Sequence, residues 1–167
     1  MAFDLSELVA GKAVLIDANI FIYAATERSE QCTQLIERCQ AYELLGVTTA
    51  EILSEVCHRL MLSEAAATGL ISRESASDLR PKYDVIRRLT RYWAQTVRIF
   101  DSNLLVLDLD ETRHHSAYRI RTRYGLLTND SLIVAAALSY GISCLASRDV
   151  DFDRIAELTV YKPSDVP

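Results

Sequence analysis

The sequence predicts an α/β/α sandwich with a mostly parallel central sheet of about five strands. Two observations support this fold class. Short apolar runs alternate with longer segments of helical spacing along the chain, which is the pattern of strands joined by helical crossovers. The 167 residues also include only 5 glycines and 3 prolines, so long irregular connections are not expected.

Five apolar runs are predicted to be strands. The first, at 13–16, reads A-V-L-I and ends abruptly at Asp17. A continuous apolar run of this kind is typical of a strand that is buried on both faces of a parallel sheet. The other four predicted strands are 46–49, 104–109, 142–146 and 159–161.

Helical spacing predicts the crossovers between these strands. Ile52, Val56 and Leu60 stand four residues apart and form one apolar stripe. The helix predicted at 111–124 ends at Gly125, a typical C-terminal cap. The other predicted helices are 19–39 with a break near 27–30, 50–61, 130–140 and a short turn at 150–156.

The length suits a single domain spanning 1–167. The segment at about 63–100 is predicted to be helical and is rich in charged residues, with Pro81 marking a break. This segment is interpreted either as an inserted helical pair used for dimerisation or substrate choice, or as an ordinary solvated helical surface.

Composition and charge restrict the class of protein. A formal net charge of −5 argues weakly against a protein that holds nucleic acid by charge alone, although a carboxylate-rich metal site would itself raise the acidic count. The four cysteines form no C-x-x-C pair, so no disulfide framework is expected. No signal-peptide pattern or membrane-length apolar segment is present. We therefore expect a cytoplasmic protein with no membrane association.

Four acidic side chains are candidates for one catalytic site. In a parallel sheet, ligands collect beyond the carboxyl ends of the strands. Asp17 follows the first predicted strand, and Asp149 lies three residues past the fourth. Asp130 opens the helix that leads into the fourth strand, and Glu55 lies about one turn into the helix after the second. The topology therefore places three carboxylates at one end of the sheet, within reach of Glu55.

Such a group of like charges favours a bound cation, because mutual repulsion raises the pKa values of crowded carboxylates. A donor set of oxygens, without histidine or cysteine, suits Mg²⁺ or Mn²⁺. These ions activate water and stabilise in-line displacement at phosphorus. The pattern therefore favours metal-dependent phosphoester chemistry.

Each aspartate also has a structural alternative. Asp is a favoured residue at the N-terminal cap of a helix, and Asp17, Asp130 and Asp149 each precede or open a predicted helix. Asp151 is interpreted as a surface residue of the short turn that follows.

Either Glu51 or Glu55 could be the acid that the helix after the second strand contributes to the site. Glu51 fits a capping box that begins at Thr48, which would give it a structural role. Glu55 could instead pair with Arg59, one turn later. Glu55 is favoured as the ligand because its apolar neighbours suggest partial burial, where an unpaired carboxylate is costly.

Four segments carry the acidic positions in order. They are V-L-I-D-A-N-I-F-I-Y-A (14–24), T-T-A-E-I-L-S-E-V-C-H-R-L (48–60), L-L-T-N-D-S-L-I-V-A-A-A-L (126–138) and L-A-S-R-D-V-D-F-D-R-I (145–155). Together they resemble the PIN domain family, and within it the VapC-like toxins of prokaryotic toxin–antitoxin systems. The likeness extends over about 13–163. The resemblance rests on all four motifs occurring in this order and at these spacings.

The resemblance implies a set of roles for these residues. The metal ligands and catalytic residues would be Asp17, Glu55, Asp130 and Asp149, with Asp151 as a further metal ligand. Asn19 and Ser147 would support the site, whereas Ser131 departs from the alanine usual in the third motif. The resemblance also implies cleavage of an RNA substrate with Mg²⁺ or Mn²⁺, a homodimer, and inhibition by a small antitoxin protein.

Two alternatives remain open. One is a non-catalytic module of the same fold that binds RNA or protein, and the other is a stand-alone RNA-processing nuclease. A phosphohydrolase of the haloacid dehalogenase class is disfavoured, because the first strand is followed by D-A-N-I-F rather than D-x-D-x-T. A dinucleotide enzyme is disfavoured because no G-x-G-x-x-G follows that strand.

Overall fold

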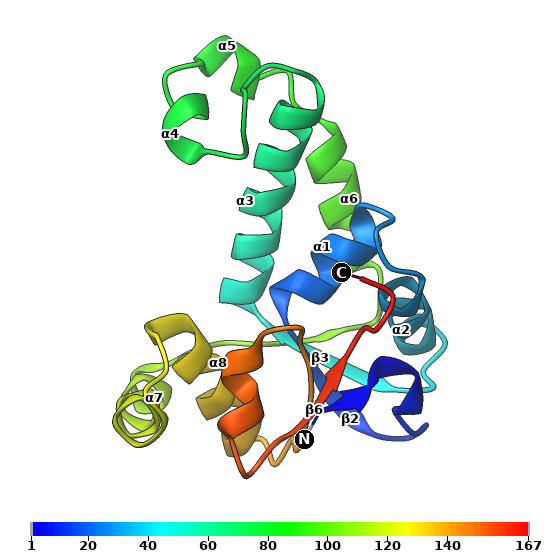
Figure 1. The fold of residues 1–167 in the computed structure, drawn as a ribbon, viewed down its shortest axis with the longest axis vertical. Coiled ribbons are helices and arrows are strands. Elements are labelled where there is room, and N and C mark those ends of the chain that lie inside the picture. Colours follow the sequence, from blue (N-terminus) through cyan, green and yellow to red (C-terminus); the bar gives the residue numbers. More distant parts are fainter. Residues whose placement is uncertain (1, 167) are drawn as a thin grey trace.

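The computed structural model describes residues 2–166. Its central sheet has six parallel strands in the order β1-β6-β5-β2-β3-β4. The α/β fold class is confirmed (Figure 1), and the sheet has six strands rather than about five. In chain order the strands are β1 (Phe3–Asp4), β2 (Ala13–Ile16), β3 (Leu45–Thr49), β4 (Leu105–Leu107), β5 (Cys144–Ala146) and β6 (Thr159–Lys162).

The strand that the sequence did not reveal is β1. It has two residues, with Phe3 opposite Tyr161 and Asp4 opposite Lys162 of β6. A strand this short carries no periodic signal. Its conformation depends on pairing with a strand from the other end of the chain, which no local pattern encodes.

Helices and short 3-10 turns connect the strands. The break predicted near 27–30 separates α1 from α2, and Gly125 ends α7 in the left-handed conformation at φ 66°. The helices are α1 (Ala18–Ala25), α2 (Glu30–Gln40), α3 (Ala50–Ala67), α4 (Ala76–Leu79), α5 (Tyr83–Ile86), α6 (Arg91–Phe100), α7 (Glu111–Tyr124) and α8 (Thr128–Ser139), and the 3-10 turns are η1 (Leu5–Glu7) and η2 (Val150–Arg154).

The centre of the sheet is buried on both faces. Val14, Leu15 and Ile16 of β2 are each 0% exposed, as the continuous apolar run predicts. Right-handed crossovers place α1 to α6 on one face of the sheet and α7 and α8 on the other. Ile20 of α1 and Val134 of α8 join the same core, and this sandwich holds the carboxyl ends of β2 and β5 in fixed positions.

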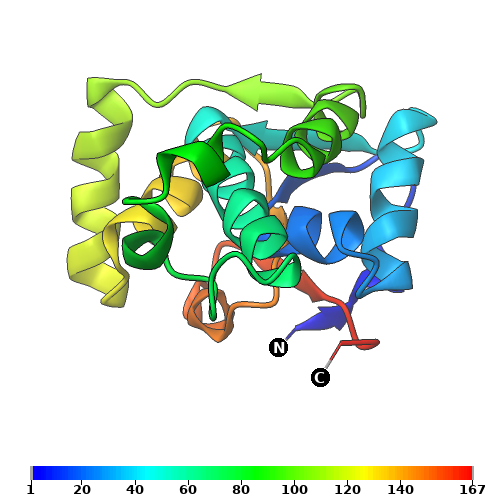
Figure 2. The same ribbon diagram turned by 90° about the horizontal axis from the view of Figure 1, so that it is seen from above.

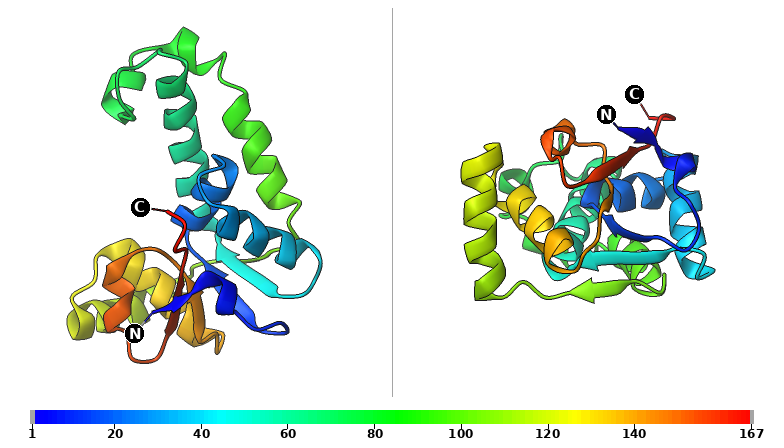
Figure 3. Two further views of the ribbon diagram at one scale, coloured as in Figure 1. Left: turned by 45° about the vertical axis from the view of Figure 1, so that its right-hand side comes forward. Right: turned by 90° about the horizontal axis from the view of Figure 1, so that it is seen from below.

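A helical arm extends from the sheet (Figures 1 and 3). Its shaft consists of α3 and α6, and its tip consists of residues 68–90 with α4 and α5. Glu64 of α3 joins the two shaft helices by accepting hydrogen bonds from the backbone nitrogens of Thr90 (3.1 Å) and Tyr92 (2.8 Å). The tip overhangs the side of the molecule that holds α8 (Figure 2). A small separate core holds the tip, formed by Leu62, Ala65, Ile71, Leu79 and Leu89.

Within residues 2–166, no helix combines the length and the apolar character that crossing a bilayer demands.

Candidate active site

Asp17 lies where β2 ends and α1 begins, and only 8% of it is exposed. Its carboxylate accepts hydrogen bonds from the backbone nitrogen of Ala18 (2.7 Å), from Oγ of Ser147 (2.6 Å) and from Nδ2 of Asn19 (2.5 Å). Asp17 therefore does cap α1, as the structural alternative predicted. Because the cap is also a buried carboxylate, it has a strong electrostatic effect on the site.

Burial raises the pKa of Asp17 from 3.8 to about 6, because desolvation disfavours the ionised form. The hydrogen bonds from Ser147 and Ala18 act in the opposite direction, and the nearby charges of Glu55 and Asp130 raise the pKa further. A cation beside Asp17 would favour the ionised carboxylate.

Ser147 connects the loop after β5, which carries Asp149, with Asp17 at the start of α1. Its Oγ donates to Asp17 and accepts from the backbone nitrogen of Asp149 at 3.0 Å and from Nδ2 of Asn19 at 3.2 Å. Oδ1 of Asn19 accepts from the backbone nitrogen of Arg148 at 3.1 Å. The loop after β5 is thereby fixed against the start of α1, in agreement with the supporting positions predicted for Asn19 and Ser147.

Replacing Ser147 with alanine is expected to raise the pKa of Asp17 above about 6, because the lost hydroxyl hydrogen bond stabilises the ionised form. The free energy of unfolding should fall by about 1 kcal/mol. Carboxyl NMR titration and urea unfolding of the metal-free protein measure these effects. Ser143→Ala, at an exposed position before β5, is the control. An unchanged Asp17 titration in Ser147→Ala would contradict the assigned network.

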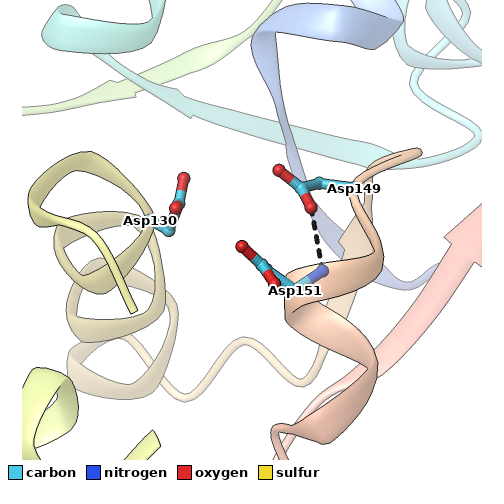
Figure 4. A group of neighbouring side chains, drawn as sticks. All are labelled: Asp130, Asp149 and Asp151. Atoms are coloured by element: carbon cyan, nitrogen blue, oxygen red, sulfur yellow. Dashed lines mark hydrogen bonds between the residues drawn. The ribbon is translucent and has the colours of Figure 1, made fainter. Parts of the chain in front are cut away.

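Three further carboxylates meet between α8 and η2 (Figure 4). One oxygen from each of Asp130, Asp149 and Asp151 lies within 4.8 Å of the others. Asp149 caps η2 by accepting a hydrogen bond from the backbone nitrogen of Asp151 at 2.8 Å. Asp151 also pairs with Arg154 at 2.9 Å. Asp151 therefore faces the group rather than only decorating the surface of the turn.

Asp130 does not cap its helix. The capping alternative for Asp130 is wrong, because the helix predicted from about 130 begins at Thr128, its cap position is Leu127, and Asp130 lies in the first turn of α8. The pKa of Asp130 is raised mainly by burial and then by the charges of Asp149 and Asp151. No hydrogen bond from the described residues offsets these effects. The Asp130 carboxylate thus has like charges as neighbours and lacks a donor.

Glu55 is more exposed than its neighbours suggested. Its side chain is 43% exposed and lies 4.0 Å from Arg59, so the expected partial burial is wrong and the pairing alternative is realised. The apolar neighbours Ile52 and Val56 turn into the core, while Glu55 occupies another face of α3 and lines the cleft described below.

The capping box expected for Glu51 is also absent. The cap of α3 is Thr49 rather than Thr48, and its Oγ1 accepts from the backbone nitrogen of Ile52 at 3.2 Å. Glu51 is exposed and does not line the cleft that holds the aspartates. Position therefore favours Glu55 over Glu51 as the second acid.

A cleft of about 430 Å³ connects these groups. All four predicted acids line it, namely Asp17, Glu55, Asp130 and Asp149. Ser63 and Glu74 contribute from the arm, so the arm forms part of the cleft wall. Tyr23 and Arg28 also line it. Sequence analysis did not single out these two residues. Tyr23 lies in the first acidic segment but is not an acid, Arg28 lies outside the four segments, and only the tertiary fold brings them to the site.

The donor set fits a divalent cation. Every candidate ligand is a carboxylate oxygen, which suits Mg²⁺ or Mn²⁺. Ligand oxygens of one such ion lie within about 4.2 Å of one another, close to the 4.8 Å limit of the group of Asp130, Asp149 and Asp151. A cation would add positive charge beside Asp130, where Arg154 alone opposes the charges of three carboxylates, and would compensate the buried charge of Asp17.

Solved structures of low sequence identity share this fold. VapBC2 from Rickettsia felis, bound to a DNA fragment from its promoter, matches with a TM-score of 0.60 and 17% identity, covering 90% of this chain and 98% of that one. VapC20 from Mycobacterium tuberculosis, described as a toxin that cleaves the Sarcin-Ricin loop, matches with a TM-score of 0.56 and 12% identity, covering 86% and 95%.

Sequence comparison gives the family. Ribonuclease VapC6 from Methanocaldococcus jannaschii is 31% identical over 99 residues, which cover 50% of this chain and 60% of that protein. The match thus spans less than two thirds of that relative's length. The family model described as PIN domain matches residues 14–158, which is most of the chain and includes all of the predicted acids. The chain belongs to the PIN domain family.

Proposed function

We propose that this protein is a Mg²⁺- or Mn²⁺-dependent endoribonuclease that hydrolyses RNA phosphodiester bonds, and that it is the toxin of a toxin–antitoxin pair. The observation that carries the proposal is that Asp17, Glu55, Asp130 and Asp149 all line the same cleft. The similarity to Ribonuclease VapC6 supports RNA as the substrate. The similarity to VapBC assemblies supports a small antitoxin as the partner.

Asp17, Glu55, Asp130 and Asp149 would hold the metal ion, with Asp151 as an additional ligand. When bound, Mg²⁺ or Mn²⁺ supplies an activated water and positive charge for displacement at phosphorus. That charge would offset the repulsion at Asp130, because no hydrogen-bond donor among the described residues contacts it and Asp149 and Asp151 repel it.

The remaining residues of the site orient the carboxylates. Ser147 and Asn19 fix the position of the Asp17 carboxylate through the hydrogen bonds described above. The burial of Asp17 strengthens electrostatic interactions at this point, because water screens them less. The open cleft suits single-stranded or looped RNA, whose bases and backbone are accessible.

We infer that the protein acts in the cytoplasm as a homodimer. All four cysteines are free thiols, which fits a reducing compartment. The homodimer is the assembly implied by the resemblance to VapC-like toxins.

The test is cleavage of total cellular RNA by the wild type with Mg²⁺, with Mn²⁺ or with excess EDTA, with Asp17→Asn as the control for contaminating nucleases. Discrete fragments that require both metal and Asp17 are the expected result. Absence of cleavage by the folded wild type under every condition would support a non-catalytic RNA- or protein-binding module. Cleavage that no small protein partner restrains would favour a stand-alone processing nuclease.

A further inference from the structure

Two arginines meet at one tyrosine beside the carboxylates. Nη1 of Arg148 donates a hydrogen bond to the hydroxyl of Tyr23 at 3.3 Å. The guanidinium of Arg28 lies over the ring of the same Tyr23, with Cζ 5.3 Å from the ring centroid. Tyr23 and Arg28 line the cleft that holds the four acids, so this cationic group borders the proposed catalytic site.

Neither arginine is neutralised. Among the ion pairs formed by residues 2–166, none includes Arg28 or Arg148, whereas Arg59 in the same cleft lies 4.0 Å from Glu55. Two guanidinium groups held at a single tyrosine repel each other. An anion between them would convert this repulsion into attraction, and guanidinium groups match the geometry of phosphate oxygens.

The backbone fixes both arginines in relation to the catalytic acids. Glu27 adopts a left-handed conformation at φ 56°, and the backbone nitrogen of Arg28 donates to the carbonyl of Tyr23 at 2.9 Å. The backbone nitrogen of Arg148 donates to Asn19 Oδ1, and Asn19 in turn contacts Asp17. The backbones of both arginines are therefore tied to the segment that carries Asp17.

We propose that Tyr23, Arg28 and Arg148 form a subsite that binds the RNA phosphate adjacent to the scissile one. The two guanidinium groups bind the phosphate, and Tyr23 is a positioning residue that holds both. This inference rests on the proposed nuclease function. It explains how a site rich in carboxylates, on a chain of net charge −5, can bind RNA, which is itself a polyanion. Phosphate contacts of this kind set the register of the strand without reading its sequence.

The test measures binding and cleavage with the full chain. Binding of a fluorescently labelled single-stranded RNA is followed by anisotropy in Ca²⁺, which fills oxygen-ligand sites, and steady-state cleavage is followed in Mg²⁺. We expect Arg28→Ala and Arg148→Ala each to raise the Kd and KM about tenfold, to change kcat by less than about twofold, and to reduce the salt-dependence slope of binding by about one. Lys12→Ala, just before β2 at the opposite end of the sheet, is the control and should resemble the wild type.

Three further measurements distinguish the subsite from the metal site. Tyr23→Phe keeps the ring beneath Arg28 but removes the hydroxyl that holds Arg148, so the rise in Kd should be smaller, about threefold. Calorimetric affinity for Mn²⁺ should not fall in any of these variants, because removing a positive charge near the acids does not weaken cation binding. A dinucleotide with one phosphate should be cleaved equally well by wild type and Arg28→Ala, whereas longer RNA should not.

The outcomes separate this inference from the proposed function. If the wild type cleaves RNA but the arginine variants match Lys12→Ala in Kd and salt slope, the subsite is wrong and the nuclease stands. If the wild type binds RNA through these arginines without cleaving it, the phosphate-binding role of the arginines stands, whereas the nuclease and the register relative to a scissile phosphate are wrong. Loss of kcat rather than KM, or equal loss on the dinucleotide, would place the arginines at the scissile phosphate and overturn the proposed register. A wild type that neither binds nor cleaves RNA overturns both.

Discussion

Replacing Asp130 with asparagine is expected to reduce the single-turnover rate of RNA cleavage by about 100-fold or more. The two side chains have nearly the same shape, but asparagine loses the negative charge that would hold the metal ion. Asp130 lies within 4.8 Å of both Asp149 and Asp151 through its carboxylate oxygen, so the effect should be centred on the metal. Calorimetric affinity for Mn²⁺ should fall together with the rate.

Asp153→Asn is the matched control for this change. Asp153 is in η2, close in sequence to Asp149 and Asp151, but it pairs with Lys162 at 2.8 Å. Its replacement should leave cleavage and Mn²⁺ affinity within about twofold of wild type, because exposed ion pairs contribute little. Equal rates for Asp130→Asn and Asp153→Asn would show that the acidic group does not hold the catalytic ion.

The metal-free protein is expected to lose stability as the pH rises from about 4 to about 8. The pKa of Asp17 in the folded protein is about 6, above its ordinary value of 3.8. The stabilising contribution of the protonated form is therefore complete below the unfolded pKa and is lost as the pH rises through the folded pKa. Because each pH unit between these values corresponds to about 1.4 kcal/mol, the loss is about 3 kcal/mol.

Urea unfolding in EDTA at about pH 4 and about pH 8 measures this dependence. Asp17→Asn remains uncharged, so its advantage over wild type should increase by about 3 kcal/mol between the two conditions. Mn²⁺ at the higher pH should stabilise the wild type more than Asp17→Asn. A wild type and an Asp17→Asn variant with the same pH profile in EDTA would contradict the burial of an ionisable Asp17.

Local signals predicted the part of the fold that positions the first acid. The apolar run at 13–16 and the aspartate at its end encode a buried strand and a cap within a few neighbouring residues. Gly125 likewise marks the end of α7 through its own conformational freedom. These features depend on interactions between residues close in the chain, so they can be predicted from one sequence.

Other features depend on contacts between distant segments. Strand β1 requires β6 as a partner, and the exposure of Glu55 depends on how α3 packs against the body of the molecule. The meeting of Tyr23 with Arg148 joins residues 125 positions apart. The exact start of a helix also decides what an acid near it can do. Because Thr49 rather than Thr48 caps α3, Glu51 does not form the capping box expected for it. Sequence patterns identified the acids, whereas only the fold shows which ones share a cleft.

The separate core of the arm has a consequence for motion. Five buried side chains hold the tip, whereas the main core, on both faces of the sheet, is much larger and continuous. Small cooperative units of this kind open at a lower free energy than the whole domain. Amide hydrogens in residues 68–90 should therefore exchange with solvent faster than those of β2 and β5. Because Glu74 from this segment lines the cleft, the entrance can widen and close again while the sheet and its acids remain in place.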